Sequence, residues 1–256
     1  MMTHKLFLAW QDPNSRSWFP IGRLTFNGQQ YKFVYTYGAQ KAQRESKFQP
    51  LHSFPELTRE YRASELFPLF ANRLMRPSRP DYRDYIEWMN IPRHQDDPIA
   101  ILSRSGGRKA TDSFEIFPCP EPDENGLYHI HFFCHGLRHI PQGSIARISE
   151  LQSNEQLYLA NEFQNPYDSQ ALLLCTKDHH ILGYCPRYLV ADALEILREQ
   201  PDLVHVHVEQ VNFAPTPLQF RLLCNMTAKW SPEFRPFSGE EYQPIVSEAS
   251  VAGICG

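Results

Sequence analysis

Several features of membrane, secreted and nucleotide-hydrolysing proteins are missing from this sequence of 256 residues. No uninterrupted apolar run reaches the roughly 18 residues that a transmembrane helix needs, and the N-terminus lacks the apolar core of a signal peptide. No glycine-rich segment has the spacing of a P-loop, which binds nucleotide phosphates. We therefore expect a cytoplasmic protein without a membrane partner.

Paired cysteines are also missing. The six cysteines form no C-x-x-C pair, and four of them lie in apolar, strand-like runs, which favours buried thiols in a reducing compartment over disulfide bonds. A zinc site would require His129, His131, His135 or His139 to join Cys134, whereas histidines that alternate along a strand more often form one of its faces. We expect no metal and no other cofactor.

Positive charge is scarce as well. The formal net charge is -4 at pH 7, and the second half of the chain holds fewer Lys and Arg than Asp and Glu residues. A protein that coats long stretches of phosphate backbone needs many cations. A nucleic-acid contact in the second half must therefore use few phosphates in a defined geometry, as a site for a strand end would.

The motifs of common catalytic sites are absent from the sequence. It contains no G-x-S-x-G elbow, no H-E-x-x-H motif and no typical pair of catalytic carboxylates. The basic, glycine-containing segment 103–109 could cradle a phosphate, but a helix C-cap followed by a solvated loop is the favoured interpretation. The arginines at 73, 76, 79 and 83 form a second basic cluster, for which a solvated surface is the default and guidance of a DNA strand the alternative. We predict that the protein is not an enzyme.

Hydrophobic alternation predicts strands in the first part of the chain at 5–10, 18–26, 31–37 and 113–117, with a hairpin turn at Asn27-Gly28. Helices are predicted at 64–74, at 81–89 and from Pro98 to the glycine pair Gly106-Gly107. The polar, proline-rich segment 118–127 then marks a domain boundary.

Short strands dominate the second part of the chain. They are predicted at 129–135, 144–148, 157–163, 171–176, 181–184, 203–212 and 218–226, with one amphipathic helix at 187–199. The predicted fold class is α+β: an N-terminal β-sheet with short helices, followed by a small OB-like β-barrel with one helix. The predicted domains are 1–117, 129–228 and a proline-containing C-terminal tail at 229–256.

Four short motifs in the second part occur in a fixed order. They are Gly136-Leu137-Arg138-His139, Leu157-Tyr158-Leu159, Asn165-Pro166-Tyr167-Asp168-x-x-Ala171 and Leu182-Gly183-Tyr184-x-Pro186-Arg187, and a helix follows the last. The series covers about residues 130–228 and resembles a HIRAN domain. This resemblance implies an OB-like barrel that binds DNA. One characterised family member captures the 3′-hydroxyl end of a single strand.

The resemblance also implies a role for each matching position. Tyr167 would stack on a base, Asp168 would accept a hydrogen bond from the terminal 3′-hydroxyl, Arg138 would contact a phosphate, and His139 would flank the end nucleotide. The rim of the same site would include Asn165, Tyr184 and Arg187. The family member with known end binding has a tyrosine where this chain has His139, and an aromatic residue is expected in the last hairpin, for which Phe213 is the nearest candidate.

Elementary chemistry supports this combination of residues. Stacking of a base on an aromatic ring is sequence-tolerant and contributes roughly 1–3 kcal/mol per base. A carboxylate repels internal phosphates but can accept a hydrogen bond from a free hydroxyl, and a nearby arginine offsets the repulsion. The alternative is a purely structural type I turn in which Asn165 and Asp168 bond the local backbone.

The first part of the chain more loosely resembles the N-terminal subdomain of HipA-type toxins. The similarity rests on 21–26, on Phe33-x-Tyr35 and on 64–70, while the aspartate motifs of the HipA kinase are absent. We expect a non-catalytic protein that recognises single-stranded DNA 3′ ends in DNA repair or in defence, with a nuclease or helicase as a protein partner. The alternative is a protein–protein adaptor that docks a HipA-like or DNA-processing enzyme and binds no DNA.

Overall fold

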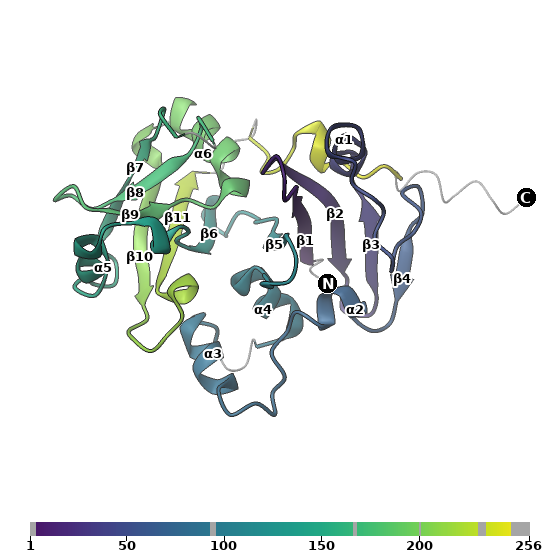
Figure 1. Ribbon diagram of the computed structural model, residues 1–256, viewed down its shortest axis with the longest axis horizontal. Coiled ribbons are helices and arrows are strands. Elements are labelled where there is room, and N and C mark those ends of the chain that lie inside the picture. The colour runs from purple at the N-terminus through teal and green to yellow at the C-terminus, as the bar shows by residue number, and fades with distance from the viewer. Residues whose placement is uncertain (1–3, 93–95, 166–167, 200, 230–233, 247–256) are drawn as a thin grey trace, which may run out of the picture. The chain divides into compact units, whose positions relative to one another are not determined.

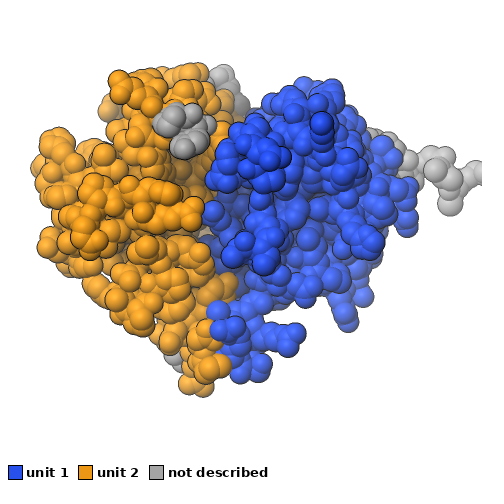
Figure 2. Space-filling model, in the orientation of Figure 1, with its two compact units in different colours: residues 1–79, 96–119, 237–256 blue, residues 80–95, 120–236 orange. Residues whose placement is uncertain are grey.

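The computed structural model describes the chain except residues 1–3, 93–95, 166–167, 200, 230–233 and 247–256. The chain forms two compact units, and neither is continuous in sequence (Figure 2). The first comprises residues 1–79, 96–119 and 237–256, and the second comprises residues 80–95 and 120–236. Each unit contains one antiparallel sheet (Figure 1).

The sheet of the first unit has the strand order β4-β3-β2-β1-β5. Its strands are β1 (His4–Gln11), β2 (Trp18–Phe26), β3 (Tyr31–Tyr35), β4 (Tyr61–Ala63) and β5 (Phe114–Pro118). The predicted Asn27-Gly28 hairpin joins β2 to β3, and Gly28 adopts the positive φ of 88° that this turn demands.

Both faces of this sheet are covered. Leu6 and Leu8 point into a cluster that contains Phe33, whose ring stacks on that of Phe54 at a centroid distance of 4.1 Å. On the opposite face Phe7 contacts three further aromatic rings, those of Phe117, Phe237 and Tyr242. Two of these rings come from the C-terminal segment, which thereby becomes part of the first unit. Burial on both faces explains why β1 is apolar at successive positions rather than at alternate ones.

The helices of the first unit are α1 (Tyr37–Ser46), α2 (Pro68–Ala71), α4 (Pro98–Ser105) and the 3-10 turn η4 (Glu240–Tyr242). The start and end of α4 follow the sequence signals: Asp97 accepts hydrogen bonds from the backbone N–H groups of Ile99 and Ala100, and Gly106 ends the helix in the left-handed conformation. Helix α1 is absent from the sequence prediction. The helix predicted at 64–74 is wrong in extent, because only the four residues of α2 are helical.

Arg73, which was assigned to a solvated basic cluster, is buried. Its guanidinium donates to Asp112 Oδ2 over 2.6 Å and to the carbonyl oxygen of Gly107 over 2.8 Å. Arg73 therefore stabilises the loop that follows α4, and it is not part of a nucleic-acid surface.

The second unit contains a curled six-stranded sheet with the order β6-β11-β10-β7-β8-β9. Its strands are β6 (Leu127–Phe133), β7 (Gln156–Asn161), β8 (Leu172–Cys175), β9 (Ile181–Tyr184), β10 (His205–Val211) and β11 (Leu222–Lys229). Strands β6 and β9 are the two edges of the sheet, yet His135, just beyond β6, pairs with Tyr184 of β9. The sheet therefore curls until its edges meet at this point, as in a partly closed barrel.

The helices of the second unit are α3 (Tyr82–Trp88), α5 (Gln142–Ile148), α6 (Arg187–Glu199) and the 3-10 turns η1 (Leu137–His139), η2 (Pro201–Leu203) and η3 (Leu218–Phe220). The strand predicted at 144–148 is wrong, because this segment lies in α5. Ser144 and Ile148 are the buried residues of α5, and their spacing of four is that of one helix face. Within the described ranges, no helix of either unit is long and apolar enough to cross a membrane.

Candidate nucleic-acid interface

Four of the predicted site residues, Asn165, Asp168, Tyr184 and Arg187, are connected by polar contacts at the turn between β7 and β8. The side-chain oxygen of Asn165 accepts a hydrogen bond from the backbone N–H of Asp168 over 3.0 Å, and Asp168 Oδ1 accepts one from the N–H of Gln170 over 3.1 Å. Both side chains thus have the structural role that the turn interpretation assigns to them. Pro166 and Tyr167 lie outside the described residues, so the stacking role of Tyr167 stays a prediction.

Glu162, which the sequence did not single out, joins this turn to strand β9. Its Oε2 atom accepts hydrogen bonds from Asn165 Nδ2 over 2.6 Å and from the Tyr184 hydroxyl over 3.0 Å. Burial, followed by the hydrogen bond to Glu162, raises the pKa of Tyr184, so its hydroxyl keeps its proton as a donor. Asn165 and Tyr184, predicted as rim residues from motifs far apart in the sequence, therefore share one acceptor.

Asp168 and Arg187 form the second link across the site. Arg187 Nε lies 3.1 Å from Asp168 Oδ2, and the two side chains keep 35% and 23% of their accessible surface. Arg187 is the first residue of α6, so the ion pair ties the turn to the start of this helix. The pair places a positive charge directly beside the carboxylate that the HIRAN resemblance assigns to the 3′-hydroxyl.

Tyr184, three residues before Arg187, also takes part in the closure of the barrel. His135 and Tyr184 exchange both backbone hydrogen bonds, each of 2.9 Å. Two glycines with positive φ adjoin this pair: a Cβ atom on Gly136 would lie 2.7 Å from the Tyr184 ring, and one on Gly183 would lie 2.4 Å from the carbonyl oxygen of His135. Only residues without a side chain let the two sheet edges approach this closely.

Arg138 and His139 belong to η1, directly after this closure. Both side chains are exposed, and Arg138 Nε donates to His139 Nε2 over 3.0 Å. The buried side chain of Leu137 anchors the turn. A chain of hydrogen bonds connects this turn to Asp168. It runs from the backbone pairing of His135 with Tyr184, through Glu162, to Asn165, which binds the backbone of Asp168.

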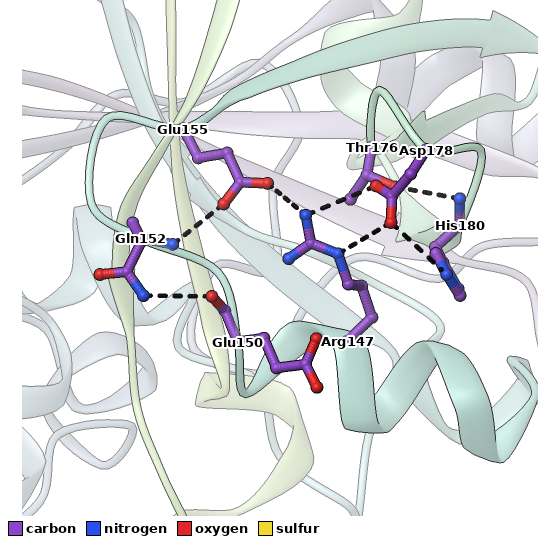
Figure 3. A network of polar contacts seen from close by, with 7 residues as sticks. All are labelled: Arg147, Glu150, Gln152, Glu155, Thr176, Asp178 and His180. Carbon is purple, nitrogen blue, oxygen red and sulfur yellow. Dashed lines mark hydrogen bonds and ion pairs between the residues drawn. The ribbon is translucent and has the colours of Figure 1, made fainter.

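Helix α5, which follows η1, is fixed to the β8–β9 turn by a network of polar contacts (Figure 3). Arg147 Nε lies 3.1 Å from Asp178 Oδ2, and Arg147 Nη2 lies 2.6 Å from Glu155 Oε1. Hydrogen bonds from Thr176 and Arg147 lower the pKa of Asp178 to about 2. The network therefore holds α5, which follows Arg138 and His139 in the chain, against the turn that leads into β9, the strand that carries Tyr184.

Two exposed phenylalanines lie on connections of the second unit. Phe213, the aromatic expected in the last hairpin, is 61% exposed in the connection between β10 and β11. Phe163, which follows Glu162, is 79% exposed. Neither ring is part of the core, so both are available to a ligand.

The histidines of β6 and β10 do not combine into a metal centre. Within the described ranges, no three His, Cys, Asp or Glu residues are placed so that they could hold a metal ion. His129 and His131 instead have carboxylate neighbours, with Nε2 to Oδ2 of Asp123 at 3.1 Å and Nε2 to Oε2 of Glu209 at 3.7 Å. This is the placement expected when alternate residues of a strand form one polar face.

A protein-family model for the HIRAN domain matches residues 127–230 of the chain. No curated protein matches the sequence. Among solved structures, a protein from Lactobacillus plantarum is 21% identical with a TM-score of 0.31, and the match covers 40% of this chain and 97% of that one. The HIRAN domain of human HLTF is also 21% identical, with a TM-score of 0.30, and the match covers 41% of this chain and 77% of that one.

The match to the family model agrees with the extent that the sequence motifs predicted, and it contains the turn, the closure and the start of α6. Residues 127–230 therefore form a HIRAN domain, which is a nucleic-acid-binding domain.

Proposed function

We propose that this protein is a non-catalytic binder of single-stranded DNA that recognises a free 3′ end through its HIRAN domain. The observation that carries the proposal is the pairing of Asp168 with Arg187 at the β7–β8 turn. It places an acceptor for a hydroxyl next to a cation, within a domain of a nucleic-acid-binding class.

The carboxylate of Asp168 has lone pairs left for another donor. An ionised carboxylate offers about four lone-pair positions, and the contacts with Gln170 and Arg187 use one oxygen each. A terminal 3′-hydroxyl could therefore donate to Asp168 without displacing either partner. An internal phosphodiester has no such proton to donate, and its negative charge is repelled by the carboxylate.

The neighbouring groups complete the proposed site. Tyr167 would stack on the terminal base, Arg138 would contact a phosphate, and His139 would flank the end nucleotide. Asn165 and Tyr184 would hold the rim through their shared contact with Glu162. Because few cations take part, affinity should fall only mildly with salt.

Fluorescence anisotropy with one oligonucleotide in two forms tests this proposal. A linear single strand with a free 3′-hydroxyl should bind, and its covalently closed circle of the same sequence should bind much more weakly. The RNA version of the linear strand separates DNA from RNA recognition. Equal binding of circle and linear strand would rule out end recognition.

The function of the first unit remains a separate proposal. We propose that it recruits a nuclease or helicase to the captured end in repair or defence. If no strand binds in any form, the protein is better explained as an adaptor that docks a HipA-like or DNA-processing enzyme.

A further inference from the structure

The strand register of the second unit aligns two rows of side chains with the proposed site. Tyr184 of β9 lies opposite Leu173 of β8, which lies opposite Ala160 of β7. In the next row, Ile181 lies opposite Cys175, which lies opposite Tyr158. Residues that pair directly across neighbouring strands project to the same face of a sheet. Tyr158 and Ala160 are two positions apart along β7, as are Cys175 and Leu173 along β8, so both rows lie on one face of the sheet. A register shift between Leu174 and Cys175 brings Ile181 opposite Cys175, although Ile181 is three positions from Tyr184 along β9. The row Tyr158–Cys175–Ile181, here named the outer row, therefore shares its face with Tyr184.

Side-chain contacts and burial support this assignment of faces. Glu162 follows Ala160 by two positions, and its carboxylate reaches the Tyr184 hydroxyl, as expected for residues on one face. The leucines at alternate positions, Leu174 and Leu182, have no exposed surface and point into the barrel. The outer row instead faces outward.

The outer row exposes large apolar side chains. Tyr158 is 42% exposed and Ile181 is 39% exposed. Single exposed apolar residues are common on protein surfaces and need no explanation. These two lie in one row, however, and that row is the neighbour of the row that contains Tyr184 (strands β7, β8 and β9 in Figure 1).

We propose that the outer row binds the nucleotides on the 5′ side of the captured end, with Tyr158 as a base-stacking platform. This inference rests on the proposed function, because the captured end sets the direction of the strand. Glu162, just beyond the end of β7, lies four positions after Tyr158, which is a distance of about 13 Å in extended chain. A single DNA strand whose 3′ end lies at Asp168 spans this distance within the roughly 4–16 nucleotides that an OB fold binds.

The chemistry of the outer row fits bases better than phosphates. Its three residues carry no charge, and stacking on an aromatic ring needs no specific base. Contacts of this kind release no counterions, so they should leave the salt dependence of binding almost unchanged. Longer strands should therefore bind more tightly without a steeper loss of affinity at high salt.

Competition anisotropy with a dinucleotide, a tetranucleotide and a ten-nucleotide strand, all with free 3′-hydroxyl ends, tests the inference. In the wild-type protein, the longest strand should bind about fivefold to a hundredfold more tightly than the dinucleotide. Tyr158→Ala should remove most of this gain and leave dinucleotide binding unchanged, while Tyr158→Trp should retain the gain. Tyr37→Ala, at an exposed tyrosine of the first unit, is the matched control and should behave like the wild type.

The outcomes separate this inference from the proposed function. If the gain with length is the same in the wild type and in Tyr158→Ala, the outer row does not bind bases, and end capture still stands. If the gain in affinity with strand length disappears at high salt, the gain comes from phosphate contacts, and this result would also overturn the inference. If neither short nor long strands bind, the proposed function fails together with the inference, and a protein partner becomes the explanation for the exposed row.

Discussion

His135 and Tyr184 exchange two backbone hydrogen bonds of 2.9 Å, although they lie beside opposite edges of the same six-stranded sheet. This pairing closes the barrel at the place where the proposed DNA end would sit. Arg138 and His139 follow His135 closely in the chain, and the hydroxyl of Tyr184 donates to Glu162. The geometry of the site and the closure of the barrel should therefore change together.

Gly183→Ala tests this dependence. The added Cβ would lie 2.4 Å from the carbonyl oxygen of His135 and would require a φ of 139° that side chains rarely adopt. We expect the free energy of unfolding to fall by more than about 2 kcal/mol, as measured by urea denaturation. Gly143→Ala is the matched control, because nothing lies within 4 Å of its Cβ. It sits in a helix, so it should leave stability unchanged or raise it by up to about 1 kcal/mol. Equal effects of both substitutions would contradict the account of the closure.

Tyr184→Phe tests the contact with Glu162. The variant keeps the ring but loses the hydroxyl that donates to Glu162 Oε2 over 3.0 Å. Because the acceptor keeps its bond from Asn165, we expect a loss of only about 1 kcal/mol in the free energy of unfolding. Affinity for a 3′-hydroxyl strand should fall as the turn becomes less fixed. Glu162→Ala removes both contacts and should weaken binding further, whereas Glu195→Ala, at an exposed position of α6, should change neither property.

The buried thiols give a test that is independent of DNA. Burial raises the pKa of Cys134, Cys185 and Cys224, to about 12 for Cys185. Because the thiolate is the reactive form, these residues should resist iodoacetamide in the folded protein and react after unfolding. The half-buried Cys119 is the internal comparison and should react sooner. Peptide mapping by mass spectrometry distinguishes the sites. Rapid labelling of Cys185 in the native state would show that the barrel opens readily.

Asp178 should make stability depend on pH in the acid range. Its pKa is lowered from 3.8 to about 2 in the folded protein, chiefly by hydrogen bonds from Thr176 and Arg147. A carboxyl group with a lowered folded-state pKa contributes stability that is complete above the unfolded value and is lost as pH falls through the folded value. The difference in unfolding free energy between the wild type and Asp178→Asn should therefore shrink between about pH 4 and pH 2. A difference that stays constant over this interval would contradict the assignment.

Local periodicity was enough to predict most of the secondary structure. Alternating apolar residues predicted β2 and β3, and the apolar stripe at helical spacing predicted α6 over its observed range. The prediction failed at α5. Ile145 and Ile148 are β-branched residues of the kind enriched in strands, but their spacing of three fits one side of a helix. The buried face that combines Ser144 with Ile148 depends on tertiary packing.

The family motifs located the domain, but they could not show how its residues are connected. Glu162 carries no motif, and its role depends on strand pairing that places it beside Tyr184. The outer row likewise requires the register of β7, β8 and β9, including the irregularity between Leu174 and Cys175. The association of the segments 80–95 and 237–256 with their units also depends on contacts between distant parts of the chain. None of these relationships has a signal in local spacing.

The most direct test of the central claim combines one substitution with one change in the DNA end. The affinities of the wild type and of Asp168→Ala are compared for a strand that ends in a 3′-hydroxyl and for the same strand ending in a 3′-deoxy sugar, with Asp202→Ala as the control. A hydrogen bond to a charged group contributes about 1.5–3 kcal/mol, so the wild type and the control should bind the hydroxyl strand at least about tenfold more tightly. Asp168→Ala should bind both strands equally. If Asp168→Ala still prefers the hydroxyl strand as strongly as the wild type does, Asp168 does not recognise the 3′ end.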